Sequence, residues 1–232
     1  TEGYTFDISP PPKPVINAIT DDTFGASDSD GITSDQTLSF SGTAEANSTV
    51  EVFLDSGSGA VSIGTAVTDV IGAWVFDYEG TVLLDGDYVV ITRATDAAGN
   101  TSADSDPFNV TIDTSIPNKP VITSVSDDTA GASNSDGVTS DAGLIFHGTA
   151  DANITVEVFV DGSSIGTTSS DGAGLCSLDH SGTLLANSSF SVTAVATNVA
   201  GTTGSASDAF TLVVDTVAPS ISINNTISPD TG

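Results

Sequence analysis

Aspartates with few basic neighbours are the residues of this chain whose types and spacing suit a chemical role, and that role is cation binding. They crowd into one stretch near the N-terminus, and a second stretch 106 residues later repeats nearly the same spacing. Calcium takes about six to eight oxygen ligands from carboxylates and carbonyls, often on flexible loops that contain glycine. The predicted ligands are Asp21, Asp22, Asp28, Asp30 and Asp35 in the first stretch and Asp127, Asp128, Asp136 and Asp141 in the second, where Asn134 replaces the remaining carboxylate.

The overall charge favours a cation as the partner of these carboxylates. The chain has 31 acidic residues and three basic ones, Lys13, Arg93 and Lys119, which gives a formal net charge of −28. Such a charge repels nucleic acid and anionic membranes, so both classes of partner are excluded. The carboxylates must instead be solvated, protonated or neutralised by bound cations. The alternative to calcium is that they only solvate loops and oppose edge-to-edge aggregation.

The other reactive side chains form no catalytic pattern in the sequence. His147 and His180 are the two histidines, and the internal repeat described below has Ser41 and Tyr78 in their places. No nucleophile elbow, phosphate-binding glycine loop or zinc-ligand spacing accompanies them. We therefore expect no enzyme activity.

The single cysteine, Cys176, cannot form a disulfide within the chain. It aligns with the single tryptophan, Trp74, at a strand position that we expect to face the core, where a cysteine behaves as a small apolar residue. No segment approaches about 18 consecutive apolar residues, and no signal-peptide pattern opens the chain. We therefore expect no membrane insertion, and we expect the chain to be a piece of a longer protein.

An internal repeat divides the chain into two homologous domains. The sequence KPVINAITDDTFGASDSDGITSD at Lys13–Asp35 returns as KPVITSVSDDTAGASNSDGVTSD at Lys119–Asp141. Both copies close on an Asp-Thr-x-x-Pro sequence, in which proline favours an extended connection. We expect residues 13–118 to form the first repeat and residues 119–219 the second. Residues 1–12 then form the tail of a preceding repeat or linker, and residues 220–232 begin the next.

The hydrophobic pattern predicts an all-β fold of about seven strands in each repeat. Apolar and polar residues alternate, and Gly, Asp and Asn separate the alternating segments. Seven short strands in about 100 residues without helical periodicity are typical of an immunoglobulin-like Greek-key β-sandwich, here two of them arranged end to end. The predicted strands of the first repeat are residues 14–20, 37–43, 49–55, 61–67, 73–78, 87–94 and 107–113.

Four motifs together carry a resemblance to a known family. They are DDTxGxSxSDGxTSD, GTAxAN, ATDAAGN and DTxxP. In combination they resemble the bacterial Ig-like repeats in the extender regions of giant RTX-type adhesins of Gram-negative bacteria, including marine ice-binding adhesins. The resemblance implies type I secretion and calcium at the domain junctions that stiffens the array. The second repeat departs from this pattern at Asn134 and Asn198, which replace Asp28 and Asp96, so those positions are expected to bind calcium more weakly or not at all.

A count of strand directions predicts which loops meet at a junction. In an up-and-down order, the loops after the first, third and fifth strands lie at the C-terminal end of the sandwich, and the loops after the second and sixth lie at the N-terminal end. The first aspartate stretch, with Asp85 or Asp87, should then approach Asp113 and the opening loops of the second repeat, which carry Asp151 and Asn198. The predicted metal ligands therefore also include Asp7, Asp96, Asp113, Asp151 and Asp215.

These inferences favour a structural role over a catalytic one. We expect monomeric spacer repeats of a secreted adhesin at a bacterial cell surface, which contact neighbouring repeats of the same chain, bind Ca²⁺ and project distal binding domains for adhesion or biofilm formation. The alternative is that the repeats themselves bind a carbohydrate or host protein, within an adhesin or a secreted hydrolase. An exposed aromatic patch that differs between the repeats would favour that alternative.

Overall fold

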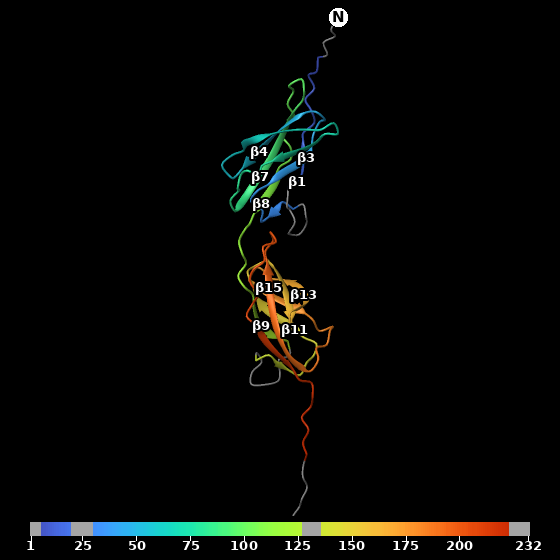
Figure 1. Cartoon of the computed structure of the whole chain (residues 1–232), viewed down its shortest axis with the longest axis vertical. Helices are drawn as coiled ribbons and strands as arrows, with labels where there is room; N and C mark the ends of the chain where they lie inside the picture. The colour runs from blue at the N-terminus through green and yellow to red at the C-terminus, as the bar shows by residue number, and fades with distance from the viewer. Residues whose placement is uncertain (1–5, 20–29, 127–135, 223–232) are drawn as a thin grey trace, which may run out of the picture. The chain divides into compact units, whose positions relative to one another are not determined.

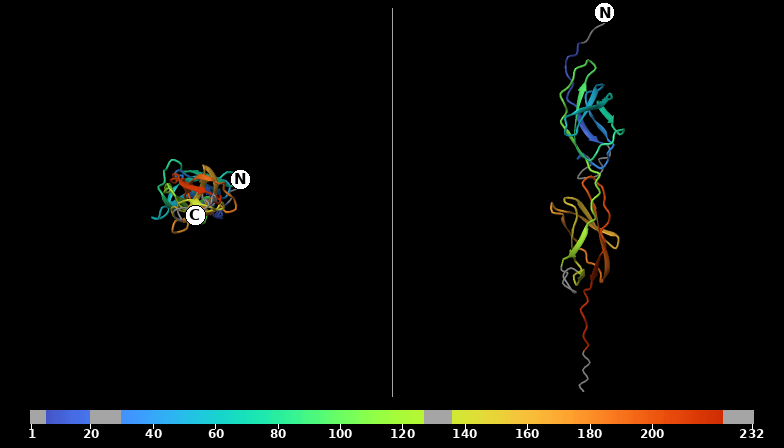
Figure 2. Two further views of the ribbon diagram at one scale, coloured as in Figure 1. Left: turned by 90° about the horizontal axis from the view of Figure 1, so that it is seen from below. Right: turned by 90° about the vertical axis from the view of Figure 1, so that its left-hand side faces the viewer.

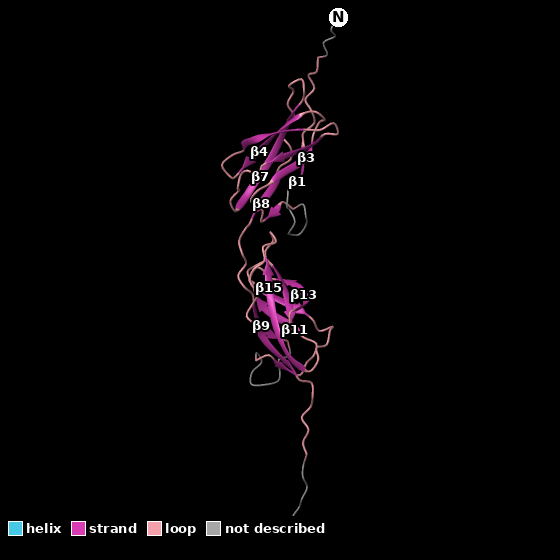
Figure 3. Ribbon diagram, viewed as in Figure 1, coloured by secondary structure: helices cyan, strands magenta, loops and turns pink. Residues whose placement is uncertain are grey.

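A computed structural model describes residues 6–19, 30–126 and 136–222 of the chain. All sixteen elements in these ranges are β-strands (Figure 3). In the described part of the chain, no helix has the length and apolar character needed to cross a membrane. The all-β prediction is confirmed.

Eight strands form the first repeat (Figure 1). The order β1-β3-β6 makes a three-stranded sheet, and β2-β8-β7-β4-β5 makes a five-stranded sheet. Two sheets in this order form an immunoglobulin-like sandwich. The strands are β1 (Val15–Ile19), β2 (Ile32–Thr33), β3 (Ser39–Thr43), β4 (Thr49–Asp55), β5 (Val61–Val67), β6 (Ala73–Asp77), β7 (Gly86–Thr95) and β8 (Phe108–Ile112).

The second repeat has the same sheet orders, β9-β11-β14 and β10-β16-β15-β12-β13. Figure 2 gives two further views of both repeats. The strands are β9 (Val121–Val125), β10 (Val138–Thr139), β11 (Ile145–Thr149), β12 (Thr155–Val160), β13 (Ser163–Ser169), β14 (Leu175–Asp179), β15 (Ser188–Thr197) and β16 (Phe210–Val214).

Seven of the eight strands in the first repeat match the predicted segments to within two residues. The eighth, β2, pairs in parallel with β8, with Ile32 opposite Thr111 and Thr33 opposite Ile112. The counterpart of β2 in the second repeat, β10, pairs in parallel with β16. Two-residue strands are too short to show an alternating pattern, so the sequence did not indicate them.

Each sandwich buries its own apolar core. In the first repeat, Phe40, Val52, Trp74 and Val90 are almost fully buried. In the second, Leu144, Val156, Val192 and Leu212 are buried in the same way. The predicted alternation on β7 is also confirmed, because Val90 and Ala94 are buried while Arg93 bonds to Asp104 on the surface.

The chain divides into two compact units. One unit is Thr1–Asn118 with Ala196–Ser205, and the other is Lys119–Val195 with Ala206–Gly232. The loop Ala196–Ser205 follows β15 of the second repeat but contacts residues 113–117, which explains why it groups with the first unit.

Candidate functional site

The fourteen predicted calcium ligands fall into two groups by position in the structure. Five of them, Asp21, Asp22, Asp28, Asp127 and Asp128, lie outside the described residues, as does Asn134. The other nine lie within described loops and chain connections. No three His, Cys, Asp or Glu side chains gather as a metal-binding group in residues 6–19, 30–126 and 136–222. The calcium ligand set therefore stays a prediction.

The described aspartates that follow the first strand of each repeat form local turns. The Oδ1 atom of Asp30 accepts a hydrogen bond from the N–H of Ile32 at 3.0 Å, and that of Asp35 accepts one from the N–H of Thr37 at 2.8 Å. Their counterparts Asp136 and Asp141 accept from Val138 N–H at 3.1 Å and Gly143 N–H at 2.9 Å. Aspartate side chains commonly bond to the backbone two residues on in this way. The first role of these carboxylates is to shape the loop.

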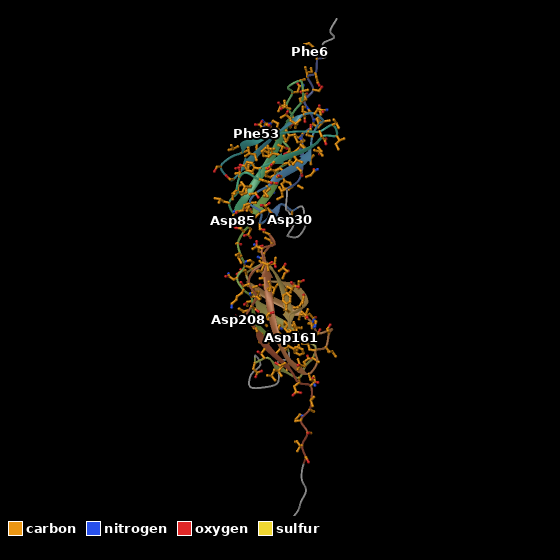
Figure 4. The ribbon with its side chains drawn as sticks, viewed as in Figure 1. Phe6, Asp30, Phe53, Asp85, Asp161 and Asp208 are labelled. Carbon is orange, nitrogen blue, oxygen red and sulfur yellow. The ribbon has the colours of Figure 1, made fainter. Side chains whose placement is uncertain are left out.

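The loop between β6 and β7 holds the segment that leaves the first repeat. The hydroxyl of Thr114 donates to Asp85 Oδ1 at 2.8 Å, and the N–H of Asp113 donates to the carbonyl of Thr33 at 3.0 Å. Asp85 and Asp30 accordingly lie at the same end of the first repeat, away from Phe6 (Figure 4). Within the first repeat, the closing Asp-Thr sequence is thus contacted both by the loop before β7 and by the end of the first aspartate stretch.

The second repeat holds its own closing segment in the same manner. Asn187 stands where the first repeat has Asp85, and its Oδ1 atom accepts from the Thr216 hydroxyl at 2.7 Å and the Thr216 N–H at 3.1 Å. The N–H of Asp215 donates to the carbonyl of Thr139 at 2.9 Å. An amide oxygen here replaces a carboxylate oxygen without loss of the contact.

The loop between β7 and β8 holds the segment that leads into the first repeat. Asn100 donates from Nδ2 to the carbonyl of Asp7 at 3.1 Å and to Asp96 Oδ2 at 2.8 Å. Farther along, Lys13 forms an ion pair with Asp106 at 2.6 Å. Pro11 lies between these two contacts and is buried. The predicted ligands Asp7 and Asp96 are therefore joined through one asparagine amide.

The leading segment of the second repeat is held by a different asparagine. Asn198 donates from Nδ2 to Asp113 Oδ2 at 3.1 Å and to the carbonyl of Ser115 at 3.0 Å. Lys119 pairs with Asp208 at 2.6 Å, as Lys13 does with Asp106. The bridging amide thus comes from the third residue of the ATDAAGN motif in this repeat and from the seventh residue in the other. Sequence reasoning placed Asn198 at the junction with Asp113 but treated it as a lost carboxylate, and it missed Asn100, although both stand in the repeated ATDAAGN motif.

We expect Asp96 to titrate in the acid range below its ordinary value. The side-chain hydrogen bond from Asn100, with backbone N–H donors of the same loop, lowers the pKa of Asp96 below 3.8, against the opposing effect of desolvation. Because the folded-state pKa is depressed, the ionised Asp96 carboxylate stabilises the folded state above pH 3.8. This contribution to the free energy of unfolding is lost as the pH falls through the folded-state pKa. Carboxyl ¹³C NMR should give an Asp96 midpoint that rises in Asn100→Ala. An unchanged midpoint would contradict the assigned cause.

All three basic residues of the chain form exposed ion pairs with aspartates. Arg93 bonds to Asp104 at 2.6 Å and lies 5.3 Å over the ring of Phe53. Exposed ion pairs contribute about 0–1 kcal/mol each, so these three add little to stability. Because they engage only Asp104, Asp106 and Asp208, they leave almost all of the negative charge uncompensated by basic side chains.

Comparison with protein families gives one match that covers most of the chain. The model of a family described as "Bacterial Ig-like domain" matches residues 10–114 and, a second time, residues 116–216. A comparison with curated proteins gives no match.

Solved structures that resemble this chain include fibronectin(III)-like modules and parts of adhesion proteins. Fibronectin(III)-like modules of Clostridium thermocellum CbhA match with 18% identity and a TM-score of 0.45, over 79% of this chain and 87% of that chain. A tetra-tandem repeat in the extending region of a large adhesion protein matches with 24% identity and a TM-score of 0.32, over 88% and 50%. A Ca²⁺-stabilized adhesin with which an Antarctic bacterium binds ice matches with 23% identity and a TM-score of 0.35, over 89% and 50%. This chain therefore spans half the length of those two adhesin structures. At these identities the likeness concerns the fold alone.

Proposed function

The chain belongs to the bacterial Ig-like domain family, and from that premise we propose that its two repeats are structural spacers of an extracellular bacterial surface protein. Their task is to add length between the parts of the protein before and after them. Bound calcium stiffens the connections between repeats. The binding of an adhesion target belongs to other parts of the full protein, and the repeats themselves are not catalytic.

The observation that carries this proposal is that each repeat fastens its leading and closing segments at opposite ends. Strand β7 has ten residues, and at about 3.3 Å per residue it spans roughly 30 Å. The loop before β7 holds the closing segment through Asp85, and the loop after β7 holds the leading segment through Asn100. A sandwich that the chain enters at one end and leaves at the other adds its full length to the array.

The charge of the chain supports the calcium part of the proposal. The 31 acidic and three basic residues leave the carboxylates repelling one another unless cations lie between them. Extracellular calcium modules have dissociation constants on the order of 0.1–1 mM. Sites in that range are filled outside a bacterial cell and largely empty inside it. The chain would then be compliant during export and stiff after it.

The test is to compare the chain in 5 mM CaCl₂ and in EDTA, with MgCl₂ as the matched control. Small-angle scattering should show a larger maximum dimension in calcium. If a site binds calcium with a dissociation constant of about 0.5 mM, binding in this buffer raises the free energy of unfolding by roughly 1.4 kcal/mol. This corresponds to a rise of about 5 °C in melting temperature. Magnesium should do less, because it requires tighter octahedral geometry than flexible loops supply. Equal dimensions and equal melting temperatures in calcium and EDTA would refute the calcium mechanism.

A single substitution should convert the amide contact of the second repeat into a calcium-dependent one. Asn198→Asp removes the donor that now bridges Asp113 and Ser115 and places a second carboxylate beside Asp113. In EDTA we expect the free energy of unfolding to fall by about 1–2 kcal/mol, because two hydrogen bonds are lost and two like charges repel each other. Calcium should reverse most of this loss in calorimetry.

The control for this substitution is Asn198→Ala, which removes the same hydrogen bonds without adding a charge. Its melting temperature should fall in EDTA and should not be restored by calcium. If calcium restores Asn198→Ala and Asn198→Asp to the same degree, the carboxylate at this position has no part in binding the ion.

A further inference from the structure

The two repeats differ in the side chain that packs against the glycine of one three-stranded sheet. In the first repeat, Trp74 of β6 lies opposite Gly42 of β3 and is 2% exposed. Two ring atoms of its indole stand 2.5 and 2.7 Å from the place that a Cβ on Gly42 would occupy, so the ring lies directly against this glycine. Cys176 of β14 takes the same position opposite Gly148 of β11 in the second repeat. One sulfur atom there occupies the place of a bicyclic ring.

The second repeat contains a hollow at this position. An open hollow of about 480 Å³ lies over the edge formed by β11, β13 and β14. It adjoins an inner, mostly apolar space of about 20 Å³ that reaches toward Phe146 and Val158. Both spaces are lined by Gly148, Thr168, Cys176 and Ser177. The hollow falls within the roughly 300–1,000 Å³ typical of small-molecule sites.

Neighbouring side chains of the second repeat do not fill the space. Ala66 on β5 of the first repeat is 8% exposed, whereas its counterpart Thr168 on β13 is only half-buried. The Thr168 hydroxyl donates to the carbonyl of Ser177 at 2.7 Å, which turns its polar atom toward the backbone of β14. Leu175, at the rim of the hollow, is 58% exposed. The apolar residues beneath this edge, such as Phe146 and Val158, remain buried, and the apolar surface open to solvent is that of Leu175 and the half-buried Cys176.

We propose that this hollow in the second repeat binds a small planar aromatic ring of the indole class. The occupant is inferred from the first repeat, where the same backbone positions hold an indole from the chain itself. The hollow is lined by the apolar groups of Gly148, Cys176 and Leu175, and its polar groups come from His147, Ser169 and Asp171. A flat ring with one N–H group suits this lining, because the ring can cover the apolar groups while the rim offers hydrogen-bond acceptors that the buried N–H of Trp74 lacks among the described residues of the first repeat.

Cys176 contributes to this site as an apolar surface and not as a nucleophile. Burial, with the nearby charge of Asp171, raises the pKa of its thiol above the ordinary value of 9.0. The thiol is therefore protonated at neutral pH and reacts slowly. As the single cysteine of the chain, it serves as a reporter of whether the hollow is filled.

The first experiment measures protection of Cys176 by indole. The intact chain is treated with a maleimide at pH 7 in increasing indole, and the modified fraction is followed by mass spectrometry. With about nine ring atoms, indole is expected to bind with a dissociation constant on the order of 1 mM. At 10 mM indole the modification rate should fall about tenfold along a saturating curve. A rate that does not change, or that falls linearly without saturation, would overturn the proposal.

A second measurement uses two variants that separate the hollow from the thiol. Cys176→Ala keeps the space and removes the sulfur, so indole should still raise its melting temperature. Cys176→Trp fills the space with the side chain of the first repeat, so indole should no longer raise it. A thermal shift of equal size in Cys176→Trp and the unaltered chain would place the binding elsewhere and refute the proposed site. This test is independent of calcium and of the spacer role.

Discussion

Trp74→Cys is expected to lower the free energy of unfolding of the first repeat by about 3 kcal/mol or more. The substitution gives the first repeat the residue that the second repeat carries naturally. Trp74 is almost fully buried among core residues such as Phe40 and Val52, and its ring lies against Gly42. Its removal takes away apolar burial and leaves a cavity, and both effects are unfavourable. For a domain of about 100 residues, this corresponds to a fall of roughly 12 °C or more in melting temperature.

Calorimetry is the suitable measurement for this prediction, because the substitution also removes the only tryptophan fluorophore. Trp74→Phe is the matched control. Among the described residues, Trp74 Nε1 is a buried polar atom without a hydrogen-bond partner. Phenylalanine keeps most of the apolar contact and removes that atom, so we expect a loss of about 1 kcal/mol or less. A similar loss in both variants would show that ring size is not what stabilises this edge.

The contrast between Trp74 and Cys176 also shows how far the sequence alone could lead. The repeat alignment predicted that both residues face the core, and both contact it. It predicted a buried cysteine, whereas Cys176 is only half-buried. An alignment compares residue types one position at a time. Whether a smaller side chain leaves a hollow depends on neighbours from β11 and β13, which only the structure places around it.

The loop contacts at the candidate site also could not be predicted from the sequence alone, because they join residues far apart in the chain. Strand alternation is a local pattern, and it predicted seven strands of the first repeat to within two residues. The bridge from Asn100 to Asp7 joins residues 93 positions apart. The sequence showed that Asn198 replaces an aspartate but not that its amide bonds to Asp113. The residue types at this end of the sandwich were predictable, and their hydrogen-bond pairing was not.

We expect calcium and asparagine amides to act alike at the ends of a repeat, because both offer positive charge, full or partial, to oxygen atoms. The amide of Asn100 bonds to one oxygen of the leading segment and one of its own loop, whereas both acceptors of Asn198 lie in the leading segment. The contacts of Asn100 and Asn198 are hydrogen bonds between groups of the chain itself, so they need no metal. We therefore expect the leading segments to stay attached in EDTA and calcium to act mainly on the aspartates that follow β1 and β9. If the proposed function holds, that division would let a repeat remain folded during export and stiffen outside the cell.

Gly31→Ala, within the first aspartate stretch, should lower the free energy of unfolding by about 2–4 kcal/mol. Gly31 has a φ of +75°, and a Cβ there would stand 2.2 Å from the carbonyl oxygen of Asn109. Its own carbonyl accepts the N–H of Thr111 at 2.8 Å, immediately before β2 pairs with β8. A side chain would push β2 away from β8 and release the end of the aspartate stretch from the closing segment. We therefore expect the calcium-induced rise in melting temperature to shrink as well.

Gly57→Ala is the control that separates backbone strain from this close approach. Gly57 has a φ of +92°, but no atom lies within 4 Å of the position its Cβ would take. Alanine should cost about 1 kcal/mol there, from backbone conformation alone, and should leave the calcium response unchanged. Urea unfolding in calcium and in EDTA measures both quantities for each variant. If Gly31→Ala costs no more than Gly57→Ala, contact between β2 and β8 does not hold the aspartate stretch. If its calcium response is also intact, the ions bind independently of that pairing.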